Sequence, residues 1–341
     1  LSADLPASHG KEQVAGVVVL KAFAGKKERL RFECSIGLQR QAVRVTDARL
    51  TKADNGGALA ANAAIALSGS KPAFDISGKL VKLDLAPELP QGTSLSGDFH
   101  AAGSTDDFEG GISLGNAGPY WKDMAICVSI IGTKEAIRLR DLEAKIMGGT
   151  MLGSAELAKA SRTVSFKVTG TGFNPAKIER ALSGNINFRL NGRFEIPGDG
   201  PVGWSIKADV YNSTFQKKPL TADVDAALSN ELIKINSLSA RGNGFSLNAR
   251  GTVQERVALL VRIDDAAKIW PGTTGTLAAH GWTRWRDNEF AGALTAHGSN
   301  IALGTLLVRS FDADINMPEG YDGPVAVGIT ANKFSYGVIK G

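Results

Sequence analysis

The sequence has few cysteines and aromatic residues, and its apolar and basic residues form no long runs. Only 2 cysteines occur in 341 residues, aromatic residues make up 7% and charged residues 21%. No apolar run reaches the ~18 residues of a transmembrane helix, and no signal peptide is visible. Charges of both signs are interspersed without a basic run, so the net charge of +5 indicates no particular anionic partner.

The sequence contains no convincing catalytic motif. Gly111-Ile-Ser113-Leu-Gly115 matches G-x-S-x-G, but Asn116-Ala-Gly118-Pro119 follows it and excludes the helix that a nucleophile elbow needs. The four histidines lack metal-binding spacing, although His280 and His297 lie near hairpin strands and could meet in space. There is no phosphate-binding or dinucleotide-binding loop.

Two pairs of carboxylates share a strand face, and they fit its solvated side better than a catalytic dyad. The pairs are Asp223 with Asp225 and Asp312 with Asp314. We therefore expect no enzyme, no cofactor and no metal site.

The rarer side chains have structural interpretations. Cys34 and Cys127 sit among apolar residues, which favours buried free thiols over a disulfide. The cluster Trp282-Thr-Arg-Trp285-Arg286 falls where a hairpin would turn. There a loop tryptophan that clamps the sheet edge is the preferred interpretation, and a partner-binding tip is the alternative.

What the chain does have is glycine, with 40 residues, and strict alternation of apolar and polar residues. Val164 to Val168, Ile186 to Leu190 and Phe245 to Ala249 each put apolar side chains on one face and polar ones on the other. This is the pattern of antiparallel strands that are wet on one side. Turns are predicted at Asn55-Gly56, Gly148-Gly149, Asn191-Gly192, Asp199-Gly200, Asn243-Gly244 and Asp322-Gly323.

A similar phrase recurs three times at a spacing of roughly 90–95 residues, which indicates stacked repeats. It runs from Val43 to Gly57, from Ile137 to Gly149 and from Ile233 to Gly244. We predict one elongated array over residues 1–341, with units 43–136, 137–232 and 233–341 and with residues 1–42 continuing a preceding unit. Since the chain begins with Leu, we expect it to be a piece of a longer protein.

Helical signals are few and keep the same phase within the repeat. Asn174-Pro175 predicts a short helix through Ile178 and Leu182 that ends at Gly184. The segments 264–270 and 87–90 occupy equivalent positions. The fold class that follows is all-β: a repetitive antiparallel sheet of about 25–30 strands, on the order of 120–140 Å long, with a few short helices. Such a sheet must curl, either into a closed solenoid with a packed core or into a half-open groove.

One family resembles this sequence. The segments that carry the likeness are Ile263-Asp-Asp, Trp270-Pro-Gly, Gly275 to Gly281, Phe290 to Ala296, and Leu303 to Ala313. They are similar to phrases that recur in the TamB branch of the AsmA-like superfamily, and the likeness covers most of residues 40–340. The family's N-terminal membrane anchor and C-terminal conserved segment are absent here, so the chain would be a middle fragment.

The resemblance implies a periplasmic β-taco, a half-open sheet whose hydrophobic trough moves phospholipid toward the outer membrane or supports outer-membrane protein assembly. It implies a diderm bacterium, an inner-membrane anchor in the parent protein, and a TamA-type barrel partner met through regions outside this chain. It implies no nucleic-acid partner. The floor of the trough would be the clearest alternating apolar positions, which act collectively on phospholipid acyl chains. These are Ile137, Leu139, Val164, Phe166, Val168, Ile186, Phe188, Leu190, Ile233, Ile235, Phe245 and Leu247.

Two other functions stay open. A closed β-solenoid stalk or adhesin would have coils of about twenty residues with stacked identical side chains. A carbohydrate-active β-helix would need clustered carboxylates in a groove.

Overall fold

The computed structural model describes most of the chain. The described residues are 2–4, 14–24, 27–39, 41–52, 57–68, 71–84, 93–118, 123–178, 182–196, 202–269, 272–286, 289–317, 325–336 and 339–340. They form two compact units, Leu1–Leu182 (unit 1) and Ser183–Gly341 (unit 2). Among these residues there is no long apolar helix of the kind that crosses a bilayer.

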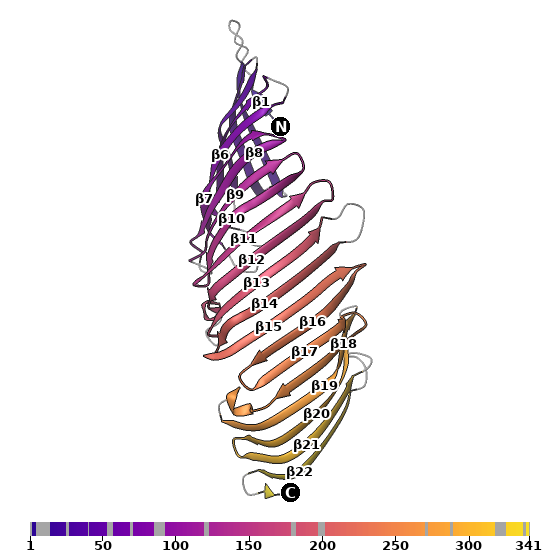
Figure 1. Cartoon of the computed structure of the whole chain (residues 1–341). Coiled ribbons are helices and arrows are strands. Elements are labelled where there is room, and N and C mark those ends of the chain that lie inside the picture. The colour runs from indigo at the N-terminus through magenta and orange to yellow at the C-terminus, as the bar shows by residue number, and fades with distance from the viewer. Residues whose placement is uncertain are drawn as a thin grey trace. The chain divides into compact units, whose positions relative to one another are not determined.

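Unit 1 is an antiparallel meander in which each strand pairs with the next one along the chain (Figure 1). Its strands are β1 (Ser2–Asp4), β2 (Val14–Ala24), β3 (Lys27–Gln39), β4 (Ala42–Lys52), β5 (Ala58–Ala66), β6 (Ala73–Leu83), β7 (Leu95–Ser104), β8 (Asp107–Asn116), β9 (Ala125–Thr133), β10 (Ala136–Ile146), β11 (Gly149–Ala158) and β12 (Thr163–Phe173).

Unit 2 repeats this architecture. Its strands are β13 (Gly184–Glu195), β14 (Gly203–Phe215), β15 (Lys218–Ser229), β16 (Leu232–Gly242), β17 (Phe245–Thr252), β18 (Arg256–Ile263), β19 (Thr273–Arg286), β20 (Glu289–Leu303), β21 (Leu306–Met317), β22 (Ala326–Tyr336) and β23 (Ile339–Lys340). In the described parts of both units the sheet is not closed, and the predicted all-β antiparallel fold is confirmed.

The predicted short helices are much shorter than expected. The described residues contain two single turns of 3₁₀ helix, η1 (Pro175–Lys177) and η2 (Ala266–Lys268). Asn174 caps η1 and Asp265 caps η2, each by accepting a hydrogen bond from a backbone N–H of the turn. The predicted extension of η1 to Leu182 is wrong at Ile178, which already lies outside the 3₁₀ turn as its C-terminal cap. The segment 87–90 lies outside the described residues.

Some of the predicted turns are confirmed, one is wrong, and others lie outside the described residues. Gly148 and Asn243-Gly244 lie in hairpin turns, as predicted. Asn191-Gly192 does not, because β13 continues through both residues, which pair with Lys207 and Ile206. The dipeptide Asn-Gly favours a turn only where the two flanking segments can pair with each other, and here β13 pairs with the later strand β14. Asn55-Gly56, Asp199-Gly200 and Asp322-Gly323 lie outside the described residues.

Register shifts mark the repeated phrase. β4 shifts between Val45 and Ala48, β10 between Leu139 and Leu142, and β16 between Ile235 and Leu238. These strands stand six apart in chain order, and each begins a copy of the phrase seen in the sequence. Such bulges bend a strand and increase its twist without exchanging its two faces.

Neighbouring side chains accept hydrogen bonds from backbone groups at the β4 shift and at two further register shifts, one between β6 and β7 and one between β13 and β14. The N–H of Asp47 donates to Asn62 Oδ1 at 3.0 Å, and the N–H of Lys82 donates to Ser96 Oγ at 3.0 Å. In unit 2 the N–H of Asn187 donates to Ser213 Oγ at 2.7 Å, and Ser213 is only 4% exposed. The Asn187 N–H is half-buried, where a donor without a partner would cost free energy, so Ser213 stabilises this irregular position. The N–H groups of Asp47 and Lys82 are exposed, and their bonds contribute less.

We therefore expect Ser213→Ala to lower the free energy of unfolding by about 1–3 kcal/mol, because it leaves the Asn187 N–H half-buried without an acceptor. Ser205→Ala, at an exposed position of the same strand, should change the free energy by less than about 0.5 kcal/mol. Urea denaturation measures both. Equal effects from the two variants would contradict this role for Ser213.

Candidate functional site

Unit 1 carries a continuous row of apolar residues across its sheet, from β2 to β12. Directly opposed residues of antiparallel strands lie on the same face, so the pairing defines the row. It runs through Gly16, Ile36, Val45, Ala63, Ile76, Ala101, Gly110, Ile130, Leu139, Ala155 and Phe166. With strands ~4.8 Å apart, the row is on the order of 50 Å long.

Unit 2 has an equivalent row from β13 to β22. Its members are Leu190, Ala208, Val224, Leu238, Ala249, Leu259, Gly281, Leu294, Ile315 and Val327. Neither row contains a charged or hydrogen-bonding side chain. We call the side of each unit's sheet that carries its row the apolar face, and the opposite side the polar face.

The twelve residues predicted to line a groove all belong to the apolar faces. Ile137, Leu139, Val164, Phe166 and Val168 lie on that of unit 1, where Leu157 pairs with both Ile137 and Val164. The other seven lie on that of unit 2, where Phe245 pairs with Ile263 and Leu247 pairs with Val261. All twelve are half-buried. Their contact with lipid stays a prediction.

Half-burial is the general state of these faces. Among the described residues no large side chain is fully buried. Exposure increases toward the last strands of unit 2, where Ile315 is 39% exposed, Val327 58% and Ile329 69%. A sheet face packed against a second layer would enclose such residues, as protein cores do. The apolar faces are therefore surfaces with unused capacity to bury hydrocarbon.

The polar face of unit 2 shows the expected contrast. The row beside the apolar one holds Arg189, Asp209, Asp223, Ser239, Asn248, Leu260, His280, Thr295, Asp314 and Gly328. Cross-strand ion pairs are exposed there: Arg189 Nη1 lies 3.7 Å from Asp209 Oδ2, and Lys207 Nζ lies 3.2 Å from Asp225 Oδ2. Exposed pairs of this kind add little stability, and their main effect is to keep this face in water.

The predicted solvated role of the paired carboxylates fits their contacts. Ser239 Oγ donates to Asp223 Oδ2 at 3.3 Å, and Thr295 Oγ1 donates to Asp314 Oδ1 at 2.8 Å. Asn236 Nδ2 donates to Asp225 Oδ1 at 2.9 Å. This bond, together with Lys207, holds the pKa of Asp225 below its ordinary value, so the carboxylate stays ionised. A general base would need the opposite shift.

His297 makes a chain of hydrogen bonds that the sequence did not reveal. Its Nδ1 lies 2.8 Å from Asp312 Oδ1 and its Nε2 lies 3.2 Å from Ser299 Oγ. The connectivity is that of a Ser-His-Asp triad. However, the side chains of His297 and Asp312 are 56% and 66% exposed on the polar face, outside any enclosed pocket formed by these three residues. His280 lies diagonally beside His297 because it pairs with Thr295, and no metal-binding group of side chains occurs in the described residues.

The other candidates have equally plain surroundings. Ser113 lies in the middle of β8, with its Oγ 3.5 Å from Cys127 Sγ, so the serine has no sharp turn to expose it. Both cysteines are free. Cys34 is buried as predicted, but the predicted burial of Cys127 is wrong, because its side chain is exposed. Cys127 pairs with Ser113 and Glu143, which puts it on the exposed polar face.

The aromatic–basic cluster belongs to the ends of β19 and β20. The rings of Trp285 and Phe290 meet edge to face with centroids 6.3 Å apart, and Arg256 lies 5.3 Å above the ring of Trp282. Trp282 is thus part of a strand and contacts the neighbouring strand β18, whereas a loop position was predicted. The contacts favour a structural role at the sheet edge.

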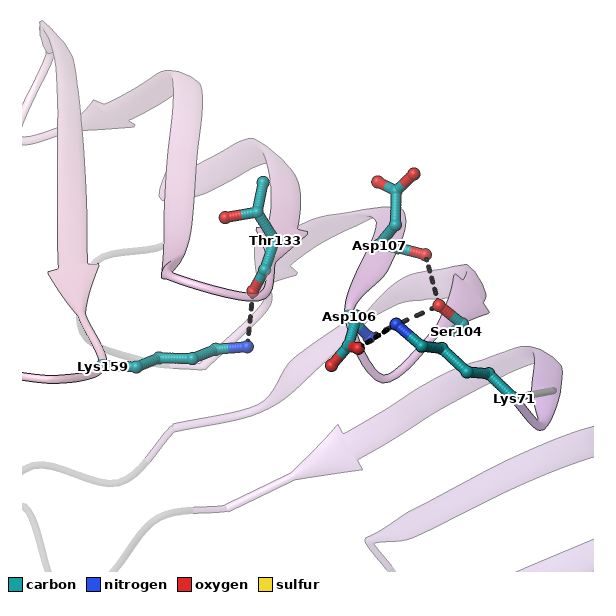
Figure 2. Close-up of polar contacts among 6 residues, drawn as sticks. All are labelled: Lys71, Ser104, Asp106, Asp107, Thr133 and Lys159. Carbon is teal, nitrogen blue, oxygen red and sulfur yellow. Dashed lines mark hydrogen bonds and ion pairs between the residues drawn. The ribbon is translucent and has the colours of Figure 1, made fainter.

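The turns at one rim of unit 1 carry charges of both signs. Figure 2 shows Lys71, which precedes β6, paired with Asp106 in the β7–β8 turn. The backbone N–H of Asp106 donates to Ser104 Oγ at 3.4 Å. Lys159 reaches from the end of β11 to the carbonyl oxygen of Thr133, 2.6 Å away at the β9–β10 turn. These contacts join turns at the same edge of the sheet. Lys71, and more weakly Lys134 and Lys159, lower the pKa of Asp106.

A separate hollow of about 760 Å³ lies on the polar face of unit 1. Arg49, Asn62, Lys79, Asp98 and His100 line it, and Lys79 Nζ lies 3.6 Å from Asp98 Oδ1. It is open to solvent and faces away from the apolar row.

Comparison with known proteins adds no identification. No family model, no curated protein and no solved structure matches this chain.

We expect Lys71→Met to raise the pKa of Asp106 toward its ordinary value of 3.8, and Lys134→Met to raise it less. Because the folded pKa is depressed, the stability that Asp106 contributes is present above its unfolded pKa and is lost as pH falls through the folded value. NMR titration of the side-chain carboxyl below pH 5 measures the shift. A larger rise in Lys134→Met than in Lys71→Met would contradict the assignment.

Proposed function

We propose that this chain is a segment of a lipid conduit. Its apolar faces hold phospholipid acyl chains and let them move along the sheet toward the outer membrane. The observation that carries the proposal is the pair of uninterrupted apolar rows, which are half-buried over most strands and become exposed at Ile315 and Val327 in the last strands of unit 2.

Physical chemistry supports an acyl chain as the occupant. Each CH₂ group gains about 0.8 kcal/mol when it leaves water, whichever apolar residue it touches. Every strand contributes Val, Ile, Leu, Phe, Ala or Gly at the same place, so the free energy of a chain changes little from one strand to the next. The tails of one leaflet extend ~15 Å, half of a ~30 Å hydrocarbon core. Each row is longer than that, so a lipid can take several positions along it.

The headgroup would remain in water at the rim of the sheet. In unit 1 the turns at one rim carry Lys71 and Lys159 (Figure 2), and Lys134 belongs to the same set of turns. Ammonium groups can pair with a phosphate, which would otherwise lose hydration when the tails are buried. Asp106, which pairs with Lys71, and Asp107 also lie at this rim.

The sequence resemblance to the TamB branch of the AsmA-like superfamily supports the same function. On that basis we place the protein in the periplasm of a diderm bacterium, with an inner-membrane anchor and a contact to a TamA-type outer-membrane barrel in regions outside this chain. Support for outer-membrane protein assembly belongs to the same proposal. We propose no enzymatic role, because the carboxylates and His297 lie on the exposed polar face.

A closed structural stalk is the weaker alternative. Such a stalk gains its stability from a filled core. The rows are only half-buried over most strands, which favours an open groove whose apolar residues a bound ligand would cover.

Photocrosslinking in cells tests the proposal. A photoreactive phenylalanine analogue at Phe166, Phe188 or Ile235 should form phospholipid adducts that mass spectrometry detects. The same analogue at Lys167, Arg189 or Lys234 supplies the matched control, because each of these residues is the chain neighbour of a test position and lies on the polar face. Equal lipid capture from the two faces, or none from the apolar one, would refute the conduit.

A charge placed in the row should obstruct transport. Ala155 lies between Leu139 and Phe166 in the row of unit 1. Ala155→Asp puts a carboxylate against the passing tails, and we expect lipid transfer to fall by about tenfold or more, since an unpaired charge is costly in an apolar site. Ser154→Asp is the control, because its carboxylate faces water and Lys167.

Transfer of fluorescent phospholipid between vesicles measures both variants, and circular dichroism confirms that both keep the sheet. Unchanged transfer in a folded Ala155→Asp protein would count against movement along this row.

A further inference from the structure

Four phenylalanine rings of the apolar faces lie over glycines of the neighbouring strand. In each case the phenylalanine and the glycine are directly opposed in the register. The pairs are Phe99 with Gly78, Phe108 with Gly132, Phe245 with Gly242 and Phe311 with Gly298. Two pairs belong to each unit.

The rings occupy the space that a side chain at the glycine would need. A Cβ added to Gly132 would lie 1.9 Å from Phe108 Cε1, and one added to Gly298 would lie 2.1 Å from Phe311 Cε1. The corresponding distances are 2.1 Å from Gly242 to Phe245 Cε1 and 2.4 Å from Gly78 to Phe99 Cζ. Real Cβ atoms essentially never come this close to another heavy atom, so each ring lies down against the sheet only because its partner is glycine.

The conformation of the glycine backbone does not explain these residues. The φ angles of Gly78, Gly132, Gly242 and Gly298 lie outside the left-handed region, where glycine is favoured. Glycine also weakens a strand because it packs no side chain. At Gly132, Gly242 and Gly298 the atoms nearest to an added Cβ all belong to the opposed ring, and at Gly78 the carbonyl oxygen of Ala60 is as close as the ring of Phe99. In each pair an aromatic side chain covers an otherwise bare backbone.

We infer that the four Phe–Gly pairs set the clearance above the apolar faces, and so determine whether an acyl chain can lie across these strands. Phenylalanine is the bulkiest side chain at these points, and a ring forced away from the sheet projects into the space that a tail occupies. A ring that lies flat against the sheet supplies apolar contact without projecting above the apolar face. The inference rests on the proposed lipid function and assigns the residues that control passage at that site.

The test combines glycine substitution with lipid crosslinking in the full chain. Gly132→Ala lifts the ring of Phe108, and the photoreactive analogue at Ile137, which pairs with Gly132, reports lipid occupancy there. We expect the yield of phospholipid adducts to fall by roughly fivefold or more, because the added methyl displaces the ring. Gly298→Ala, read from the analogue at Leu277, should behave in the same way in unit 2.

Two controls separate the ring from the backbone. The double variant Gly132→Ala/Phe108→Leu keeps the methyl but removes the ring, and it should restore the adduct yield. Gly37→Ala changes a strand glycine with open space around it and should leave the yield unchanged. Circular dichroism and a thermal melt establish that each variant is folded, and Phe108→Leu alone should retain the full yield.

The outcomes distinguish this inference from the function on which it rests. Adducts in the unmodified protein, loss in Gly132→Ala and recovery in the double variant support it. Equal yields in the unmodified protein and Gly132→Ala, or loss that persists in the double variant, overturn it and leave the conduit intact. Absence of adducts from the unmodified protein at both reporter positions overturns the conduit and the inference together.

Discussion

The register of the antiparallel pairing is the constraint on which both faces depend. Side chains alternate with a period of two, so a slip by one residue would move every apolar side chain of a strand to the polar face. The three shifts at β4, β10 and β16 avoid this outcome, because the apolar row continues through Val45, Leu139 and Leu238 beside them. Side chains such as Ser213 stabilise an irregular position and thereby preserve the separation of the two faces over many strands.

This separation gives the molecule its chemical character. The cross-strand ion pairs of unit 2 and the His297 network occupy the polar face, where water screens them and they contribute little to stability. The rows on the opposite face offer only hydrocarbon and backbone. A surface of this kind distinguishes ligands by their polarity and thickness, and it requires no residue that acts alone. The site therefore consists of rows of paired residues and has no central residue.

The sequence predicted the faces well and the irregular positions poorly. Alternation assigned all twelve predicted residues to the apolar face, because in a half-solvated strand side-chain polarity reports the face directly; that these residues line a groove stays a prediction. It failed for Cys127, whose apolar chain neighbours lie on the other face, and for Asn191-Gly192, where the turn depends on which segment pairs with β13. The helical signal at Asn174-Pro175 had the right cap, but the helix ends after one 3₁₀ turn at Lys177. The Phe–Gly pairs could not be foreseen, since opposed residues such as Phe108 and Gly132 are recognised only once the register is known.

The lack of any fully buried large side chain in the described residues has a thermodynamic consequence. Most domains complete their hydrophobic core with their own chain, and their stability is then fixed by the sequence. Here much of the apolar surface has no protein layer above it, so a bound hydrocarbon would serve as the second layer of the core. By mass action such a ligand, at a free concentration c, stabilises the folded state by RT ln(1 + c/Kd), an amount that increases as the lipid supply increases. A conduit of this design would be most resistant to unfolding and proteolysis while it is carrying lipid, and most vulnerable when its supply of lipid stops.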